Sequence, residues 1–518
     1  MTATDTTSSI TLPRDSNQAL GIGQYACDFM AGRIGTPGDV VAARTTMFFT
    51  DSVLCGLSAL ACRTNAPTIL RNEAHEYPRD DGACCLGSTA RVSPEKAIAA
   101  NASAVREWDS NGTNFGYNPE LGHVAGEFGH NDFYAVPIAA AQVAGLDGAA
   151  ALRGMICLDE IRGRLAEVFS LKSYRIDHVV HGAIASAAVY GAMLGATPEQ
   201  IESAIGMTVA HYVPWRAIRA GHQLSDSKGA SAAISTEVAV LSMQRAMRGF
   251  VGPGDIFRNP EALWRQFEPT SGDCPFDLVL SHSGDDFAVM GMHFKLGLYE
   301  HQSAGALQGL IDLLSANPDL LDNPKMIKRI HITAYEPAFG IIGDPAKRDP
   351  RTRQSADHSM VYIVSTMLRK ALEHAGDGGV AGENTDDWWK ALMLVPEDYG
   401  RDALSDATTR RLMDCIEFEH GGDEYDERYP DGIPTSLRIE LDDGRHLESG
   451  LVMYPAGHAR NMTCDLEGLL AHKAGLLGHL AMDEPGPVIT RCNSLGDMGS
   501  GELLSLLDCP ITLRDPID

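Results

Sequence analysis

The polar segment from Arg106 to Phe133 concentrates side chains that can move protons or bind metal ions. Its reactive members are Asp109, Thr113, His123, Glu127 and His130. Histidine transfers protons near neutral pH, and a carboxylate can orient it or bind a hydroxyl group. The same residue types, closely spaced, also bind divalent metals. The segment therefore predicts either an acid–base site or a metal site.

The metal alternative depends on the spacing of Glu127 and His130, which matches half of the di-iron carboxylate motif. Glu417 and His420 have the same spacing, but two glycines follow them in a charged segment that we expect to be exposed. No cysteine trio has iron–sulfur spacing, and the sequence has neither a P-loop nor a GxGxxG after a predicted strand. We therefore predict no bound metal and no cofactor, and we favour the acid–base interpretation.

Further segments carry residues of the same chemistry. Asp177 and His178 precede an apolar helix, and Lys295 and His301 share a later segment. Lys228 begins a helix of small residues, where its ammonium group beside unpaired backbone N–H groups would suit a carboxylate ligand. The alternative for each is structural, since a histidine is often a satisfied core residue and a lysine is often solvated on a helix surface.

Helices must hold these residues in place. Residues 94–104 and 137–145 are predicted to be helices that flank the polar segment. Because Asp, Asn, Thr and Gly favour turns, we expect the segment itself to be a long loop, or two turns with a helical fragment. Apolar residues at helical spacing predict further helices at 47–63, 149–169, 179–195, 198–211 and 228–248.

The pattern becomes mixed after about Met292. The predicted elements are a strand at 330–335, helices at 359–374 and 385–394, and a hairpin at 436–451 with an Asp-Gly turn. Helices return after Tyr454, at 465–478 and 500–507. These last helices could pack with the N-terminal ones, which would make the mixed region an insertion.

Composition limits the classes of partner. The 518 residues are 44% hydrophobic and carry a formal charge of -27, which argues against nucleic acid or an anionic membrane as a partner. Residues 1–18 are polar, resemble no signal sequence and are predicted to be a disordered tail. The apolar run at 182–196 is too short for a membrane span and predicts a buried helix. The eleven cysteines lack a CxxC spacing, which predicts reduced thiols in the cytoplasm.

Six motifs follow one another along the chain. They are REWDSNGT (106–113) with EFGHND (127–132), RIDHVV (175–180), SKGASAA (227–233), HFKLGLYEHQSA (293–304), DHSMVY (357–362) and YPAGHAR (454–460). In this order they resemble the MmgE/PrpD superfamily, and within it the 2-methylcitrate dehydratases. The resemblance extends from about Asp28 to the C-terminus.

The resemblance implies a mainly α fold with two domains. A large helical domain would be built from both chain ends, 19–292 and 456–518, and a smaller α+β lid domain would be inserted at 293–455. It also implies a homodimer, with an active site between the two domains that needs neither metal nor cofactor.

The implied activity is that of a hydro-lyase, a carbon–oxygen lyase that removes water from 2-methylcitrate to give 2-methyl-cis-aconitate. This is a step of the methylcitrate cycle in propionate catabolism, and related tricarboxylates such as citrate are further candidate substrates. Matched by position, the catalytic residues are Asp109, Thr113, His130, His178, Lys228 and Lys295. Further candidates for substrate binding are His123, His301, Tyr335 and His358.

The implied roles divide the chemistry among these residues. His130 would transfer a proton nearest the substrate, and His178 would be a second acid or base, or a carboxylate ligand. Asp109 would orient a histidine or bind the substrate hydroxyl. Lys228 and Lys295 would balance the negative charge that develops.

The sequence departs from the family pattern at several points. Gly112 replaces an aspartate, and the long loop 114–129 makes His123 a rival of His130. The segment after Lys295 is about two residues short, which leaves the match of His301 open. Cis-aconitate decarboxylases of the superfamily carry a histidine where this chain has Ser231, which favours dehydration. Decarboxylation of cis-aconitate is the nearest alternative, and a non-catalytic protein that binds tricarboxylates or serves as a scaffold is the alternative of another class.

Overall fold

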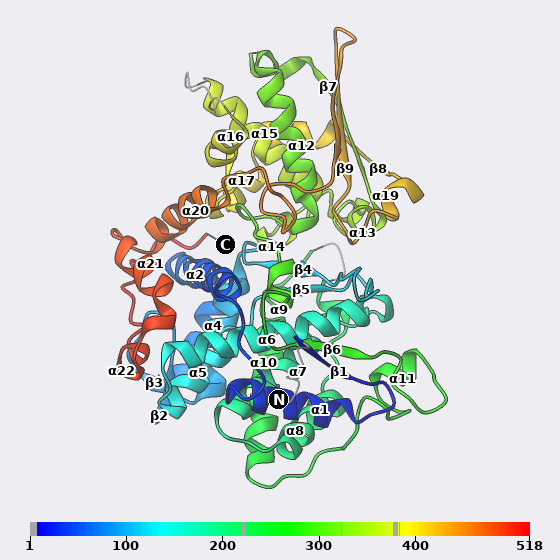
Figure 1. Cartoon of the computed structure of the whole chain (residues 1–518). Helices are drawn as coiled ribbons and strands as arrows, with labels where there is room; N and C mark the ends of the chain where they lie inside the picture. The colour runs from blue at the N-terminus through cyan, green and yellow to red at the C-terminus, as the bar shows by residue number, and fades with distance from the viewer. Residues whose placement is uncertain (1–7, 220–222, 323, 377–381, 383, 518) are drawn as a thin grey trace.

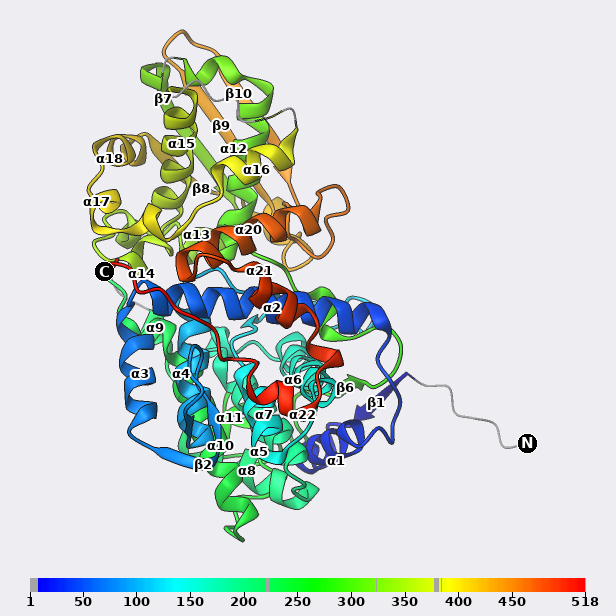
Figure 2. The same ribbon diagram turned by 90° about the vertical axis from the view of Figure 1, so that its left-hand side faces the viewer.

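The computed structural model describes residues 8–219, 223–322, 324–376, 382 and 384–517. Helix α2 (Asp39–Ala61) crosses the middle of the molecule in Figure 2 and is seen nearly end-on in Figure 1. Most helices of the N-terminal half lie on one side of α2, and a four-stranded sheet with its own helices lies on the other. The prediction of a mainly helical chain with a small mixed region is confirmed.

The helices predicted at 94–104, 137–145, 149–169, 179–195 and 198–211 begin and end close to their predicted positions, whereas α2 begins well before the predicted residue 47 and the predicted helix 228–248 is divided into two. Besides α2, the helices of the N-terminal half are α1 (Gln18–Met30), α3 (Asn65–His75), α4 (Pro94–Glu107), α5 (Ala135–Ala144), α6 (Gly148–Val168), α7 (Val179–Met193), α8 (Pro198–His211), α9 (Asp226–Gly229), α10 (Ser231–Met247) and α11 (Leu263–Phe267). The start of α8 shows the cause: Thr197 and Gln200 form a capping box, and Pro198 occupies the first turn. α7 is buried along nearly its whole length and packs against α6, α8 and α10.

Three two-stranded ribbons were not predicted. They pair β1 (Ser9–Leu12) with β6 (Leu278–Ser281), β2 (Pro78–Cys84) with β3 (Arg91–Val92), and β4 (Thr113–Phe115) with β5 (Phe128–His130). The prediction of a disordered tail at 1–18 is therefore wrong for residues 9–12, and residues 1–7 lie outside the described residues. The polar segment 106–133, all of it described, contains a ribbon instead of a new helical fragment, because two strands satisfy each other's buried backbone groups.

The mixed sheet has the order β10-β9-β7-β8. Its strands are β7 (Ile327–Ala334), β8 (Ile416–His420), β9 (Thr435–Leu441) and β10 (His446–Val452). β7 runs parallel to β8 and antiparallel to β9, and β9 and β10 form the predicted hairpin. The accompanying helices are α12 (Ala304–Ala316), α13 (Glu336–Ile341), α14 (Arg353–Ala356), α15 (Met360–Gly376), α16 (Thr385–Leu392), α17 (Arg401–Leu404), α18 (Ala407–Asp414) and α19 (Asp423–Asp426). α12 packs against β9 and β10.

The C-terminal helices return toward the N-terminal half. They are α20 (Leu466–Ala481), α21 (Gly486–Asn493) and α22 (Ser500–Leu504), and α20 packs along α2. Two hydrophobic cores meet at this pair, because α2 and α20 each place some apolar side chains in one core and some in the other. The division into a helical domain and an inserted lid, with boundaries at 292/293 and 455/456, stays a prediction.

By length and hydropathy alone, α2 is the one helix among the described residues that would suffice to cross a membrane. Within the molecule, 67% of its most apolar window is buried. Its apolar character is therefore accounted for by packing against other helices, as expected for a helix that is hydrophobic on most sides.

Candidate active site

The ribbon β4–β5 positions Thr113 beside His130. The two residues are partners in the antiparallel register, and the Thr113 hydroxyl donates a hydrogen bond of 2.8 Å to the Gly129 carbonyl. The backbone of Thr113 also exchanges hydrogen bonds of 3.0 and 2.7 Å with His293. Thr113 thus fixes the ribbon against a segment that lies far away in the sequence.

His130 and His178 face each other at the end of this ribbon. Their ring centroids are 5.0 Å apart, and His178 directly precedes α7. Burial lowers the pKa of both rings well below the ordinary value, so both are neutral at pH 7. His130 Nδ1 and His178 Nε2 have no hydrogen-bond partner among the described residues. Two neutral imidazoles with uncommitted nitrogens are suited to accept or relay a proton.

The Asp177 carboxylate lies beside the His178 ring and orients it. Its Oδ1 lies 3.4 Å from His178 Nδ1, and its carboxylate also pairs with the Arg219 guanidinium. Burial opposes ionisation of Asp177, but the charge of Arg219 outweighs burial and lowers the pKa of this carboxyl below its usual range. The carboxylate therefore stays ionised at every pH where the protein would act.

A small cavity of about 40 Å³ opens beside the two histidines. Its walls are Arg106, Thr113, Phe115, Phe128, His130, His178, Arg216, Arg219, Glu300, Gln302, Ile341, Lys347 and His358. Side chains from both sides of the molecule contribute. This volume is close to that of one water molecule, so the cavity as it stands is too small for a larger ligand.

Positive charge surrounds the cavity. Arg106, Arg216, Arg219 and Lys347 all line it. Arg106 and Arg219 are paired with the carboxylates of Asp109 and Asp177, whereas the Arg216 guanidinium has no ion pair or hydrogen bond to any described residue. A guanidinium that is more than half buried and uncommitted is a ready receptor for a carboxylate.

Positively charged side chains surround Asp109 behind the cavity wall. Its fully buried carboxylate is bonded to Lys295, lies 3.0 Å from the Arg106 guanidinium and 3.4 Å from the Lys228 ammonium. His358 Nδ1 is 3.2 Å away. Burial opposes ionisation, but the charges of Arg106 and the two lysines outweigh it and hold the pKa of Asp109 well below its usual range.

The two lysines face carboxylates rather than the cavity. Lys228 donates to Asp357 at 2.7 Å, and Asp357 also lies 2.9 Å from His358 Nδ1. Burial and the Lys228 charge lower the pKa of His358 to about 4. The structure therefore differs from the expected carboxylate cradle at Lys228: its ammonium group is already occupied by a carboxylate of the chain itself.

The remaining candidates lie farther from the histidine pair. His301 is buried between His293, at a centroid distance of 5.1 Å, and Phe115, at 5.6 Å. Tyr335 is buried and stacks on Tyr429 at 4.9 Å. Neither lines the cavity.

His123 also lies apart from the cavity. Its Nδ1 is 3.3 Å from a carboxylate oxygen of Glu167. The loop that carries His123 folds against the end of α6, where a Cβ on Gly116 would come within 1.9 Å of the Ala166 carbonyl oxygen. Of the two rival histidines, only His130 lines the cavity.

Glu300 is a cavity residue that the sequence analysis missed. Burial, and then the negative charge of Asp109, raise the pKa of Glu300 to about 7. One of its carboxyl oxygens accepts a 2.8 Å hydrogen bond from the Gln302 backbone N–H. A carboxyl that is half protonated at neutral pH is able to donate a proton. The sequence signal that could have identified Glu300 is its position directly before His301.

The spacing of Glu127 and His130 matches half of a di-iron motif, but the Glu127 carboxylate has other partners. The Glu127 carboxylate accepts hydrogen bonds from the backbone N–H groups of Phe128 at 2.9 Å and Lys172 at 2.6 Å, which is a structural role. Asp109, Asp357 and His358 do lie close enough to share a cation. The side-chain cations of Lys295 and Lys228 already occupy these carboxylates.

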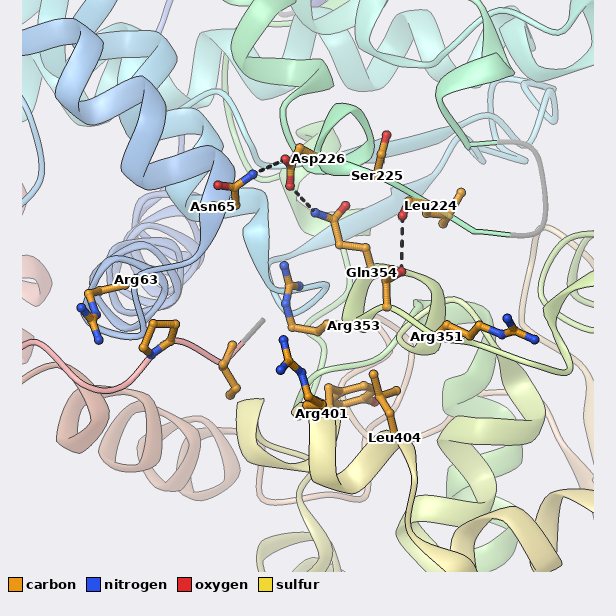
Figure 3. A pocket seen from close by; sticks show the side chains of 14 residues that line it. Arg63, Asn65, Leu224, Ser225, Asp226, Arg351, Arg353, Gln354, Arg401 and Leu404 are labelled. Atoms are coloured by element: carbon orange, nitrogen blue, oxygen red, sulfur yellow. Dashed lines mark hydrogen bonds between the residues drawn. The ribbon is translucent and has the colours of Figure 1, made fainter.

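A wider crevice of about 680 Å³ lies on another side of this network (Figure 3). Asn65 and Gln354 reach Asp226 from opposite sides, with hydrogen bonds of 2.6 and 3.2 Å. Arg353, on the wall of the crevice, is bonded to Glu107. These contacts join the N-terminal helices to α14.

Known proteins match much of the chain. A sequence profile described as the MmgE/PrpD N-terminal domain matches residues 23–272. A 2-methylcitrate dehydratase of Escherichia coli O157:H7 is 26% identical over 79% of this chain and 80% of its own length. The mitochondrial 2-methylcitrate dehydratase of Yarrowia lipolytica is 28% identical over 59% of this chain and 55% of its own length. An alkylcitrate dehydratase of a fungal species is 24% identical over 58% of this chain and 56% of its own length.

Proposed function

The chain belongs to the MmgE/PrpD family, and on that premise we propose that it is a hydro-lyase acting on a 2-methylcitrate-like tricarboxylate. The reaction removes water and leaves 2-methyl-cis-aconitate. The matched relatives are named for 2-methylcitrate or alkylcitrate. Their shared chemistry is dehydration of a hydroxy tricarboxylate.

One observation carries the proposal: two neutral histidines and an uncommitted guanidinium line the same small cavity. The histidines supply acid–base chemistry, and Arg216 supplies a receptor for one substrate carboxylate. Both requirements of a carboxylate dehydration are thus present within one site.

The reaction needs two proton transfers. A base takes the proton from the carbon next to a carboxylate, the electron pair forms the double bond, and the hydroxyl leaves as water after protonation. His130 and His178 are the candidate bases, because both are neutral at pH 7. Glu300 in its protonated form is the candidate acid.

The Asp109 cluster serves this site indirectly. Its carboxylate holds Arg106 and Lys295 in fixed positions, and Arg106 forms part of the cavity wall. Charges fixed before the reaction stabilise developing charge without reorganisation. Asp109, Lys228 and Lys295 are therefore proposed to preorganise the field around the substrate.

Product identification tests the proposal. Chelator-treated protein is incubated with 2-methylcitrate, citrate or cis-aconitate, and products are identified by mass spectrometry. The expected product is 2-methyl-cis-aconitate from 2-methylcitrate. Itaconate from cis-aconitate would instead establish the decarboxylase, and binding without turnover in every case would establish a non-catalytic protein.

Two histidine variants provide the matched comparison. His130→Ala is expected to lose about 10²- to 10⁴-fold in rate, the usual contribution of a positioned acid or base. His123→Ala should stay within a few-fold of the parent protein, because His123 lies outside the cavity wall. Equal losses in both variants would contradict the assignment.

A homodimer in the cytoplasm is proposed from the sequence alone, and light scattering tests the dimer.

A further inference from the structure

The outer face of the mixed sheet carries a histidine among carboxylates. In the parallel pair β7–β8, His331 lies opposite Glu417, and Thr333 lies opposite Glu419. Side chains alternate along a strand, so Glu417 and Glu419 share one face with His331, whereas Ile330 and Ile332 point into the core. The register of two strands therefore brings three potential metal ligands together.

The separations suit a small divalent ion. His331 Nδ1 lies 3.4 Å from Glu417 Oε2 and 3.7 Å from Glu419 Oε1. One ligand atom of each residue lies within 4.8 Å of the other two. Zinc bonds of 2.0–2.2 Å at tetrahedral angles separate neighbouring ligand atoms by about 3.4 Å. The three side chains are thus spaced as ligands before any ion is bound.

The burial and the unpaired ring nitrogens of His331 distinguish this cluster from an ordinary acidic surface. The residue is only 9% exposed, and neither ring nitrogen has a hydrogen-bond partner among the described residues. Buried polar nitrogens normally have a partner, so each unpaired one requires an explanation. Nδ1 points toward the two carboxylates, where a metal ion would satisfy it.

A neighbouring arginine takes one oxygen of Glu417, and the second oxygen and the Glu419 carboxylate remain available beside His331. Arg329 is bonded to Glu417 through Oε1, while Oε2 faces the imidazole. The Glu419 side chain is 58% exposed and has no ion pair with a described lysine or arginine. On the other side of the ring, Glu440 Oε2 lies 4.0 Å from His331 Nε2, where it could orient the imidazole.

We propose that His331, Glu417 and Glu419 bind one divalent transition-metal ion, with water completing the coordination. One imidazole and two carboxylates form a donor set that zinc accepts, whereas calcium and magnesium take oxygen ligands alone. The ion would fasten β8, which is an edge strand hydrogen-bonded only to β7 in the described sheet. The site is separate from the histidine cavity and independent of the proposed dehydratase activity.

Calorimetric titration of the chelator-treated full-length protein with zinc chloride tests the proposal. The expected result is one site that His331→Ala abolishes and that Glu419→Gln weakens by about ten-fold or more. His420→Ala is the matched control, because His420 ends the same strand and instead contacts Asp426 at 2.9 Å. It should leave the titration unchanged.

A second measurement keeps the test decisive if His331→Ala folds poorly. Zinc that binds only to the folded state raises the melting temperature, and the increase grows with the ratio of the zinc concentration to the dissociation constant. The parent protein and His420→Ala should show this increase, and Glu419→Gln, which loses an exposed ligand, should show little at the same zinc concentration. Equal zinc binding in the parent, His331→Ala and Glu419→Gln would overturn the proposal, as would no binding by the parent protein.

Discussion

The carboxylate of Asp109 is bonded to side chains from three separate parts of the chain: Arg106, Lys228 and Lys295. Asp109→Asn keeps the shape and removes the charge, which leaves buried cations uncompensated. We expect a loss of about 3–5 kcal/mol in the free energy of unfolding, measured in urea. Asp277→Asn, which breaks the exposed pair with Arg14, should cost about 1 kcal/mol or less. Similar losses in the two variants would contradict this role.

The sign of the pH effect follows from the depressed pKa of Asp109. A carboxyl with a lowered pKa stabilises the fold above its ordinary pKa, near 3.8, and this stabilisation is lost as the pH falls through the lower value in the folded protein. Asp109 therefore contributes fully at neutral pH, and the difference between parent and Asp109→Asn should shrink only in strong acid.

Arg216 is expected to act on substrate binding rather than on folding. Its guanidinium lines the cavity and has no ion pair within the described part of the chain. A hydrogen bond to a charged group contributes about 1.5–3 kcal/mol, so Arg216→Gln should raise KM about 10- to 100-fold. Arg401→Gln, on the separate crevice, should leave steady-state kinetics unchanged.

Glu300 should give the activity a pH dependence near neutrality. With a pKa of about 7, the carboxyl is protonated at pH 6 and ionised at pH 8. If it supplies the proton to the leaving hydroxyl, kcat/KM falls as the pH rises through about 7. Glu300→Gln should be slower and lack this decrease, whereas exposed Glu336→Gln should keep it. A parent profile that is flat from pH 6 to 8 would exclude Glu300 as the acid.

The same raised pKa affects stability in the opposite direction from Asp109. A carboxyl whose pKa rises on folding stabilises the fold below its ordinary value, 4.5, and this contribution is lost as the pH rises to about 7.

Sequence reasoning named three histidines that line the cavity, His130, His178 and His358, but it missed the arginines, Lys347 and Glu300, and it gave no pairing. Asp109, His130 and His178 stood in recognisable motifs. Lys228 and Lys295 are paired with carboxylates, whereas Arg216 is not. These pairings join residues more than 100 positions apart in the sequence. Such contacts leave no local signal in a single sequence.

At the scale of elements, helices were predicted best. Long apolar periodicity and a cap such as Thr197 define a helix locally, as in α8. Strand β8 was missed because residues 416–420 alternate between apolar and charged in only five positions, with an exposed outer face. Its assignment depends on pairing with β7, which lies about 80 residues earlier.

Gly112 allows the polar segment to pack against α2. A Cβ at this position would lie 2.4 Å from Phe48, and that ring is stacked on Phe294 at 3.8 Å and cannot withdraw freely. Gly112→Ala should therefore cost about 1–3 kcal/mol in the free energy of unfolding. Gly291→Ala, where a Cβ meets nothing within 4 Å, is the control and should be nearly neutral. The urea midpoint at constant slope measures both.

At the scale of the whole molecule, the small volume of the cavity implies movement on substrate binding. A volume of about 40 Å³ cannot admit a tricarboxylate, so its two walls must separate before binding. We expect a non-reacting tricarboxylate to slow hydrogen–deuterium exchange in α14 and in residues 300–303, which form one side of the junction. Exchange in α8, remote from the cavity, should not change. Binding without any change in α14 would contradict the opening.

The packing of α2 on α20 has a consequence for synthesis of the chain. About 400 residues separate the two helices. At 5–20 residues per second, α20 is translated about 20–80 s after α2. During that interval α2, which is long and apolar, lacks the helix that packs against one of its sides in the folded protein. We therefore expect newly made chains to expose part of the apolar surface of α2 until α20 is translated, and faster translation should shorten this exposure.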